Sequence, residues 1–351
     1  MKKVKLGIIG CGVIGINHVK GALSAPDRVE LTALCDIRPE AVKAAATQYK
    51  VPKAYTNPDE LLADPDVEAV VLAIPLKGRP ELGVKVLKAG KHLLMEKPLV
   101  RNMAEARALL AARGERVVAC CSARHSVYPS ARAAAKVVSD GLLGKVRLIR
   151  ARGITACGPK PKNPPPVWRV SKELNGGGIL VNWGVYDLDY LLSIVGWSVR
   201  PQTVLAQTWR APEIFRDRMA PGSDGESLYA AIVRCQGGEM IVMERGEFVA
   251  SSNDVAWSII GEKGTIHLNL IPDVGKKLLL DEATPDGVKS RVVWEGDENW
   301  DSIHITLVPD FADAILQHRA PYTSLEQGMV IQQITDAIYA SAESGRAVTI
   351  E

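Results

Sequence analysis

Gly10-Cys11-Gly12-Val13-Ile14-Gly15 is the stretch that decides the fold of the first part of this chain. It follows the apolar run Val4–Ile9 and opens the segment Val13–Leu23, whose apolar residues have helical spacing. In a strand–turn–helix unit, the first glycine of G-x-G-x-x-G permits the tight turn and the second lets the backbone approach a pyrophosphate. The third lets helix and strand pack closely, and the helix N-terminus supplies N–H donors. The sequence therefore predicts a dinucleotide site that includes all three glycines together with Val13 and Ile14.

Asp36 supplies the acidic residue that such a site needs. It ends the apolar run Val29–Cys35, about 20 residues after the last glycine, where a carboxylate binds the ribose hydroxyls. A carboxylate repels a 2′-phosphate, so NAD is expected and NADP is disfavoured. Arg38 is a further candidate cofactor residue, because its guanidinium could pair with a 2′-phosphate. The alternative is that Arg38 is only a solvated surface charge. A glycine turn used only for packing is the alternative, and the sequence context favours binding.

Strand-like and helix-like segments alternate through the first third of the chain, which predicts a parallel sheet with helices on both faces. Residues 1–122 are thus expected to form a doubly wound Rossmann domain of class α/β. The further strand-like segments are Val29–Cys35, Val67–Ile74, Lys91–Met95 and Val117–Cys121, and the helix-like ones are Pro39–Tyr49, Glu81–Ala89 and Asn102–Ala112.

The pattern changes near residue 122, and residues 123–351 are expected to form an α+β domain. A helix over Ser130–Ser139 leads to a strand over Val146–Ala156, and the segment Gly158–Pro166 is too rich in proline for either element. Short runs between residues 202 and 294, separated by glycine and proline, predict a large, mostly antiparallel open sheet. Two helices, His304–His318 and Ser324–Ser344, are expected to end the chain.

Two clusters carry groups suited to catalysis. Glu96-Lys97-Pro98 follows a predicted parallel strand, at the sheet edge where ligands bind. A lysine there has the chemistry for proton transfer beside a nicotinamide, the alternative being a surface lysine before a turn. After the triplet Gly176–Gly178, three polar residues at i, i+4 and i+7 share one face of an apolar helix, the alternative being a solvated stripe. These three residues are Asn182, Tyr186 and Asp189.

Composition excludes several other classes of protein. The chain has 43 Lys and Arg against 40 Asp and Glu, and its net charge of +3 argues neither for nor against a nucleic-acid partner. Only 5% of the residues are aromatic, which disfavours a stacking platform for single-stranded nucleic acid, so no nucleic-acid partner is expected. The six cysteines have no zinc or redox spacing, so no metal is expected. Free thiols are typical of the reducing cytoplasm, which is the expected location. No apolar run approaches the ~20 residues that span a bilayer, so no membrane association is expected.

Several motifs in this order resemble the Gfo/Idh/MocA oxidoreductase family over essentially the whole chain. They are Gly10–Gly15, Ala89-Gly90-Lys91-His92 before Glu96-Lys97-Pro98, Arg124–Pro129, Asp140–Gly144 and Gly176–Asp189. The resemblance implies NAD(P)-dependent hydride transfer between a ring secondary alcohol of a sugar or cyclitol and a nicotinamide, in a homodimer or homotetramer. Lys97 matches the family's catalytic lysine, and Tyr186 stands at its usual histidine. Asn182 replaces the usual aspartate, and Arg79 stands where many members have histidine.

The resemblance also implies roles for individual residues. Lys97 and Tyr186 are expected to be catalytic, and Lys97 also to contact the cofactor, together with Glu96 and Pro75. The expected substrate-binding residues are Asn182, Asp189, Arg124, His125 and Trp168, with a place in the core as the alternative for Trp168. Two other functions stay open: an NAD-dependent glycosidase that oxidises its substrate transiently, and a non-enzymatic NAD or sugar sensor. The substrate itself is left undetermined.

Overall fold

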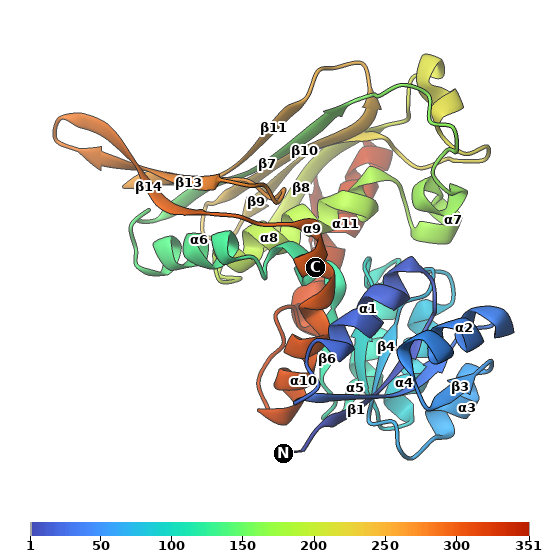
Figure 1. Ribbon diagram of the computed structural model, residues 1–351. Coiled ribbons are helices and arrows are strands. Elements are labelled where there is room, and N and C mark those ends of the chain that lie inside the picture. Colours follow the sequence, from blue (N-terminus) through green and yellow to red (C-terminus); the bar gives the residue numbers. More distant parts are fainter. Residues whose placement is uncertain (1, 351) are drawn as a thin grey trace. The chain divides into compact units, whose positions relative to one another are not determined.

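The computed structural model describes residues 2–350, which form two compact units, labelled by element in Figure 1. The first unit consists of the residues up to Arg124 and of a later segment, Trp300–Met329. The second unit consists of His125–Asn299 and the segment from Val330 onward. Nothing in the sequence pattern predicts that the chain returns to the first unit.

The first unit contains a six-stranded sheet in the order β3-β2-β1-β4-β5-β6. All of its strand pairs are parallel. The strand order reverses beside β1, the point at which doubly wound sheets bind ligands, so the predicted Rossmann architecture is confirmed. The strands are β1 (Val4–Ile9), β2 (Val29–Cys35), β3 (Lys53–Tyr55), β4 (Ala69–Leu72), β5 (His92–Met95) and β6 (Val118–Cys120).

Local sequence explains where the helices of this unit begin. The Asn102 side chain accepts a hydrogen bond from the Glu105 backbone N–H at 3.1 Å and so caps α5.

Strand β3 and helix α3 were not predicted, because segments this short show no full period of apolar residues. The helices are α1 (Val13–Leu23), α2 (Pro39–Tyr49), α3 (Pro58–Ala63), α4 (Arg79–Lys88), α5 (Met103–Arg113), α9 (Trp300–Ile305) and α10 (Leu307–Leu316).

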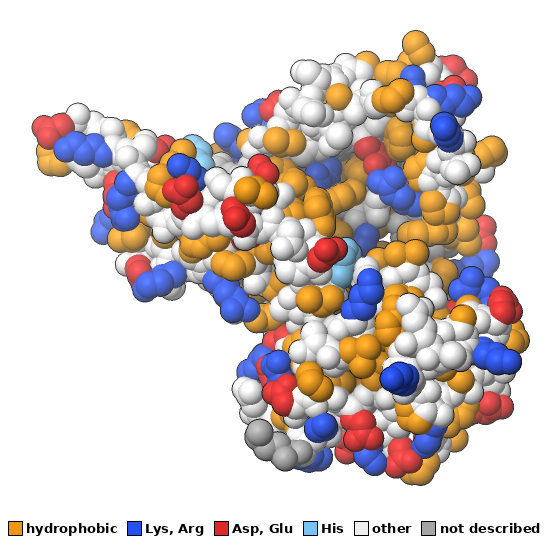
Figure 2. Space-filling model, viewed as in Figure 1, with side chains coloured by type: hydrophobic (Ala, Val, Ile, Leu, Met, Phe, Trp, Pro, Cys, Tyr) orange, Lys and Arg blue, Asp and Glu red, His pale blue; other side chains and the backbone are white. Residues whose placement is uncertain are grey.

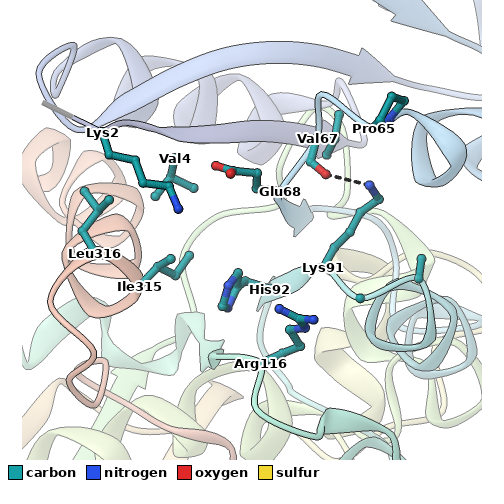
Figure 3. A pocket seen from close by; sticks show the side chains of 12 residues that line it. Lys2, Val4, Pro65, Val67, Glu68, Lys91, His92, Arg116, Ile315 and Leu316 are labelled. Atoms are coloured by element: carbon teal, nitrogen blue, oxygen red, sulfur yellow. Dashed lines mark hydrogen bonds between the residues drawn. The ribbon is translucent and has the colours of Figure 1, made fainter.

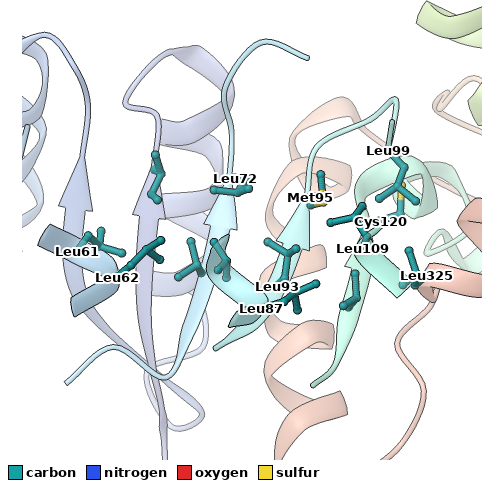
Figure 4. Packing of buried hydrophobic residues seen from close by; sticks show 14 of the residues in the cluster. Leu61, Leu62, Leu72, Leu87, Leu93, Met95, Leu99, Leu109, Cys120 and Leu325 are labelled. Carbon is teal, nitrogen blue, oxygen red and sulfur yellow. The ribbon is translucent and has the colours of Figure 1, made fainter. Parts of the chain in front are cut away.

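Hydrophobic side chains from both sheet and helices, many of them leucines, form the core of the first unit (Figure 4). All four residues of β4 are fully buried, as expected for a parallel strand covered on both faces. Leu61 from α3 and Leu109 from α5 pack in the same cluster. Leu325, at the start of α11 (Leu325–Ser344), joins it from the returning segment.

The second unit contains a nine-stranded sheet in the order β14-β13-β12-β11-β7-β10-β9-β8-β15. Only the pair β7–β10 is parallel, so the predicted mostly antiparallel sheet is confirmed. Exposure alternates along several strands, as in a sheet with one solvated face. The strands are β7 (Val146–Ala156), β8 (Pro201–Trp209), β9 (Leu228–Cys235), β10 (Met240–Val249), β11 (Asp254–Gly261), β12 (Gly264–Leu268), β13 (Lys276–Thr284), β14 (Gly287–Gly296) and β15 (Val348–Thr349).

Helices cover one face of this sheet (Figure 1). Helix α6 (Pro129–Ser139) packs against β12, β13 and β14, and α8 (Val185–Ile194) packs against β7. A short α7 (Lys172–Asn175) lies between α6 and α8 in the chain and comes directly before the glycine triplet. Residues 158–166 form neither helix nor strand, as predicted. Within residues 2–350, no helix combines the length and the apolar character that a membrane span requires.

Candidate active site

The glycine turn between β1 and α1 has the geometry of a phosphate cradle. Gly10 has φ +104°, and a Cβ atom on Gly15 would lie 1.8 Å from the Gly10 carbonyl oxygen. Both positions therefore require glycine. A Cβ on Gly12 would meet nothing within 4 Å, and no side chain caps the N-terminus of α1. The first N–H groups of α1 thus face open space, which fits a bound pyrophosphate.

The Asp36 carboxylate is hydrogen-bonded to the backbone of this turn. Its Oδ2 accepts a hydrogen bond from the Cys11 backbone N–H at 2.8 Å, and its Oδ1 accepts one from the Arg38 backbone N–H at 3.0 Å. The Arg38 guanidinium also donates to both oxygens. Burial opposes ionisation, yet these donors hold the pKa of Asp36 below its ordinary value, so a carboxylate stands beside the cradle. Ile37, which the sequence analysis did not single out, is 79% exposed here.

Lys97 is half-buried and directly follows Glu96 at the carboxyl end of β5. Its backbone N–H donates to Glu96 Oε2 at 3.1 Å. Arg79 is buried and donates to the Ile74 carbonyl at 3.0 Å and to the Pro98 carbonyl. Arg79 therefore ties the loop after β4, which includes the exposed Pro75, to the loop that carries Lys97.

Glu96 is the centre of a buried polar cluster. Its Oε1 lies 2.8 Å from His18 Nε2 and also accepts a hydrogen bond from the Arg124 guanidinium. Burial opposes its charge, but Arg124 and His18 hold the pKa of Glu96 well below the ordinary value. Arg124 thus lies against Glu96, and its predicted substrate contact stays a prediction. His18 was not among the predicted site residues, because no motif in the sequence links it to Glu96.

Cys121 completes this cluster, and three of its members carry atoms that can ligate a metal. His18, Glu96 and Cys121 offer donor atoms within 4.8 Å of one another. Burial raises the pKa of the Cys121 thiol well above its ordinary value, whereas metals bind the thiolate. Arg124 already occupies Glu96 Oε1. The chemistry of these four residues is therefore that of a buried ion pair with a neutral thiol.

In the second unit, the glycine triplet packs against protein rather than leaving space for a ligand. A Cβ on Gly177 would lie 1.8 Å from Tyr339 Oη, and one on Gly178 would lie 2.0 Å from the Glu226 carbonyl oxygen. The buried Glu226 carboxyl accepts hydrogen bonds from the N–H groups of Gly178 and Leu180 and from Tyr339 Oη, at 2.9, 3.0 and 3.0 Å. The triplet therefore anchors the start of the helical segment that follows.

The three predicted polar residues of that segment are all buried. Asn182 lies in a π-helical turn, Leu180–Gly184, and the other two lie in α8. The Tyr186 ring meets the His125 ring edge-on at 5.0 Å, whereas Asp189 accepts a hydrogen bond from Ser126 Oγ at 2.8 Å. The π turn makes the step from Asn182 to Tyr186 differ from the regular helical spacing on which the prediction rested.

His125 has a defined tautomer. Its Nδ1 lies 3.0 Å from the Leu270 carbonyl oxygen, and since a carbonyl only accepts, Nδ1 carries the proton. In the neutral ring Nε2 is then the acceptor. Trp168, the remaining predicted substrate residue, is 44% exposed in a short 3₁₀ segment.

A buried ion pair that sequence reasoning missed stands next to Tyr186. Asp187 Oδ2 lies 3.0 Å from Arg245 Nε, and Asp187 Oδ1 accepts a hydrogen bond from Trp257 Nε1 at 2.9 Å. The Arg245 guanidinium lies 4.7 Å from the centre of the Trp183 ring. Burial raises the pKa of Asp187, although Arg245 and Trp257 favour its charged form. The pair fixes Trp183, whose ring lies 5.8 Å from that of Tyr186.

Comparisons with known proteins cover both units. The chain is 25% identical to myo-inositol 2-dehydrogenase from Thermotoga maritima, over 99% of each protein. It is 24% identical to D-glucoside 3-dehydrogenase from Escherichia coli, over 99% of the chain and 97% of that protein. A solved structure of levoglucosan dehydrogenase in complex with NADH has the same fold, with a TM-score of 0.85 and 22% identity over 100% of both chains.

Matches to family descriptions identify the two halves. Residues 4–123 match "Oxidoreductase family, NAD-binding Rossmann fold", and residues 135–350 match "Oxidoreductase family, C-terminal alpha/beta domain". The predicted family and the prediction that the chain is an enzyme are confirmed by these matches. The chain belongs to the Gfo/Idh/MocA oxidoreductase family.

Proposed function

We propose that this enzyme transfers a hydride between NAD and a secondary alcohol on the ring of a sugar or cyclitol. The observation that carries the proposal is the placement of Lys97. It follows β5 at the carboxyl end of the sheet, in the same unit as the glycine cradle and Asp36. The relatives named as inositol and glucoside dehydrogenases support the substrate class.

The residues of the first unit fit a bound NAD. The cradle of Gly10, Gly12 and Gly15 holds the pyrophosphate, with Val13 and Ile14 beside it, and Asp36 accepts the ribose hydroxyls. Bound NAD supplies the hydride acceptor of the reaction. Glu96 holds the backbone of Lys97 through Oε2, and Pro75 and Arg38 complete the residues that we assign to the cofactor.

Proton transfer is the task that we assign to Lys97. As a neutral amine, its Nζ takes the proton of the substrate hydroxyl during oxidation and returns it during reduction. Tyr186 orients the same hydroxyl and shares in this proton transfer. Asn182 and Asp189 hold neighbouring hydroxyls, and Asn182 does so without charge. Arg124, His125 and Trp168 are the other residues that we assign to substrate binding.

The carboxylate of Asp36 should determine the choice of cofactor. We expect kcat/KM with NAD to exceed that with NADP by more than about tenfold, because a 2′-phosphate would meet this carboxylate. The variant Asp36→Ser should narrow the ratio, because it removes the negative charge and releases Arg38 to meet a phosphate. Steady-state rates with both cofactors give the measurement. Comparable kcat/KM values for the unaltered enzyme would contradict the assignment of Asp36.

A panel of free sugars, anhydrosugars, glucosides and inositols with NAD tests the function. Net NADH, followed by absorbance at about 340 nm, is expected with at least one ring alcohol. A glycosidase that oxidises transiently would instead release the aglycone of a glucoside without net NADH. A sensor would bind NAD or sugar without turnover. The panel therefore separates the three functions in one set of assays.

Assembly and location are proposals as well. Paired residues across the second sheet form one row on its open face, and four members of the row are apolar side chains that are at least 40% exposed. We propose that a homodimer or homotetramer covers them. These four residues are Leu205, Ile232, Leu279 and Val292.

All six cysteines are free thiols, which supports the cytoplasm as location.

The charge distribution fits a neutral substrate. On the face shown in Figure 2, Lys and Arg side chains are interspersed with Asp and Glu side chains. With a net charge of only +3, the chain has no strong overall attraction for a polyanion. We therefore propose a small uncharged sugar or cyclitol as the partner.

A further inference from the structure

A cavity of the first unit lies away from the residues assigned to the reaction. It has a volume of about 410 Å³ and is lined by residues at the amino ends of β1, β4 and β5 (Figure 3). Glu96 and Lys97 follow the opposite, carboxyl end of β5. This volume falls within the range of small-molecule sites, about 300–1,000 Å³.

Cationic side chains outnumber acidic ones around this cavity. Lys2, Lys91 and Arg116 line it, together with a single acidic residue, Glu68. Lys91 is buried, and its Nζ donates to the carbonyl oxygens of Asp64 and Val67 at 2.9 and 2.6 Å. The third N–H of the ammonium group remains to donate to a ligand. The lining therefore carries a surplus of positive charge.

The cations nearest to solvent are not neutralised by the protein. Within the described part of the chain, neither Lys2 nor Arg116 forms an ion pair or a side-chain hydrogen bond. Arg116 Nη2 lies beside Gly90, where a Cβ atom would be 3.6 Å away. Figure 3 shows the Lys2 ammonium and the Arg116 guanidinium directed to the same open space. A planar guanidinium fork with no carboxylate partner is suited to a phosphate or carboxylate.

His92 adds a neutral donor to this lining. Its Nδ1 accepts a hydrogen bond from the Val117 backbone N–H at 2.9 Å, so the ring proton is on Nε2. Burial first, and then the positive charge of Arg116, lower the pKa of His92 to about 4. At neutral pH the ring is therefore uncharged and donates from Nε2.

Glu68 gives the cavity one acceptor. Its Oε2 accepts a hydrogen bond from the Lys5 backbone N–H at 3.2 Å. The other carboxylate oxygen has no partner among residues 2–350. In Figure 3 the carboxylate stands across the open space from Arg116, so a ligand held by the cations can donate a hydroxyl to it. Ile315 and Leu316 form an apolar wall beside this polar set.

We propose that this cavity binds a small polyhydroxylated anion, a sugar-like molecule that carries a phosphate or a carboxylate. Arg116 and Lys2 pair with the anionic group, and Lys91 and His92 each donate a hydrogen bond. Glu68 accepts from a ligand hydroxyl. The proposal does not depend on the reaction, because none of these five residues belongs to the cofactor or substrate set.

Isothermal titration calorimetry on the full chain tests the proposal. Inorganic phosphate, glucose 6-phosphate, gluconate and glucose are titrated at constant ionic strength, with saturating NAD present to fill the phosphate cradle near Gly12. Saturable binding that the Arg116→Gln variant weakens is expected for glucose 6-phosphate, for gluconate or for both, whereas any binding of glucose at the substrate site should be the same in Arg116→Gln and in the unaltered chain. The arms with phosphate and gluconate decide which anionic group the cavity prefers.

Matched variants locate the binding site. Arg116→Gln and Lys2→Gln should each weaken binding by about tenfold, the loss expected for a charge-assisted hydrogen bond. Both residues lack protein partners, so folding should be unaffected. Lys43→Gln removes an exposed charge from α2, away from the cavity lining, and should change nothing. Absence of saturable binding up to about 10 mM, or equal binding by Arg116→Gln and the unaltered chain, would overturn the proposal.

Discussion

Replacing Lys97 with methionine should lower kcat by about 10²–10⁴-fold at saturating NAD, the loss expected when a proton-transfer group is removed. Methionine keeps an unbranched apolar stem but has no group that can accept a proton. The Lys97 backbone N–H bond to Glu96 does not involve the side chain, so the loop should keep its position. Steady-state rates with the best alcohol from the panel give the measurement.

A matched control and a pH profile make this result specific. Lys43→Met changes an exposed lysine of α2 and should leave kcat unchanged. If Lys97 is the base, its loss should also flatten the acidic limb of the kcat/KM profile. A Lys97→Met enzyme that binds NAD and retains kcat within about threefold would show that another group transfers the proton.

Replacing Asp187 with asparagine should lower the free energy of unfolding by about 3–5 kcal/mol, because it leaves a buried guanidinium without its carboxylate. Arg245 is only 6% exposed and cannot lose its proton at accessible pH. Asparagine can still accept the Trp257 Nε1–H bond, so the variant isolates the charge. Chemical unfolding of the variant and the unaltered chain gives the difference.

Two further variants separate this effect from a general loss of packing. Asp140→Asn breaks the exposed pair with Lys136 and should cost no more than about 0.5 kcal/mol. The double variant Asp187→Leu with Arg245→Met removes both charges and should recover much of the lost stability. A loss below about 1 kcal/mol for Asp187→Asn would show that water or another group compensates Arg245.

Local sequence predicted the elements that carry full periods of apolar residues. The strands β1, β2 and β7 have the predicted bounds, and the helix predicted over Asn102–Ala112 corresponds to α5, which Asn102 caps. The return of Trp300–Met329 to the first unit rests on contacts distant in sequence, for which one chain carries no pattern. The π-helical turn at Leu180–Gly184 depends on Glu226 and Tyr339, which lie far along the chain.

In the candidate site too, features with a local sequence pattern were predicted, and features that depend on distant residues were not. The motif spacing brought the glycine turn and Asp36 into one prediction, and in the structure Cys11 joins them. The buried partners of Glu96 were not foreseen, because His18 and Arg124 precede or follow it by tens of residues and carry no motif. At Gly177 and Gly178 the need for glycine comes from Tyr339 and Glu226. These partners lie far along the chain, so the sequence around the triplet carries no sign of them.

The most direct test of the central claim follows a single hydrogen atom. A ring alcohol that is active in the panel is labelled with deuterium on the carbinol carbon and incubated with NAD, and the reduced cofactor is analysed by mass spectrometry. The proposed reaction predicts that the deuterium is recovered in the reduced nicotinamide, in equal amount with the ketone product. Deuterium that is found in solvent, or that stays on the sugar while a glycosidic bond breaks without net NADH, would contradict it.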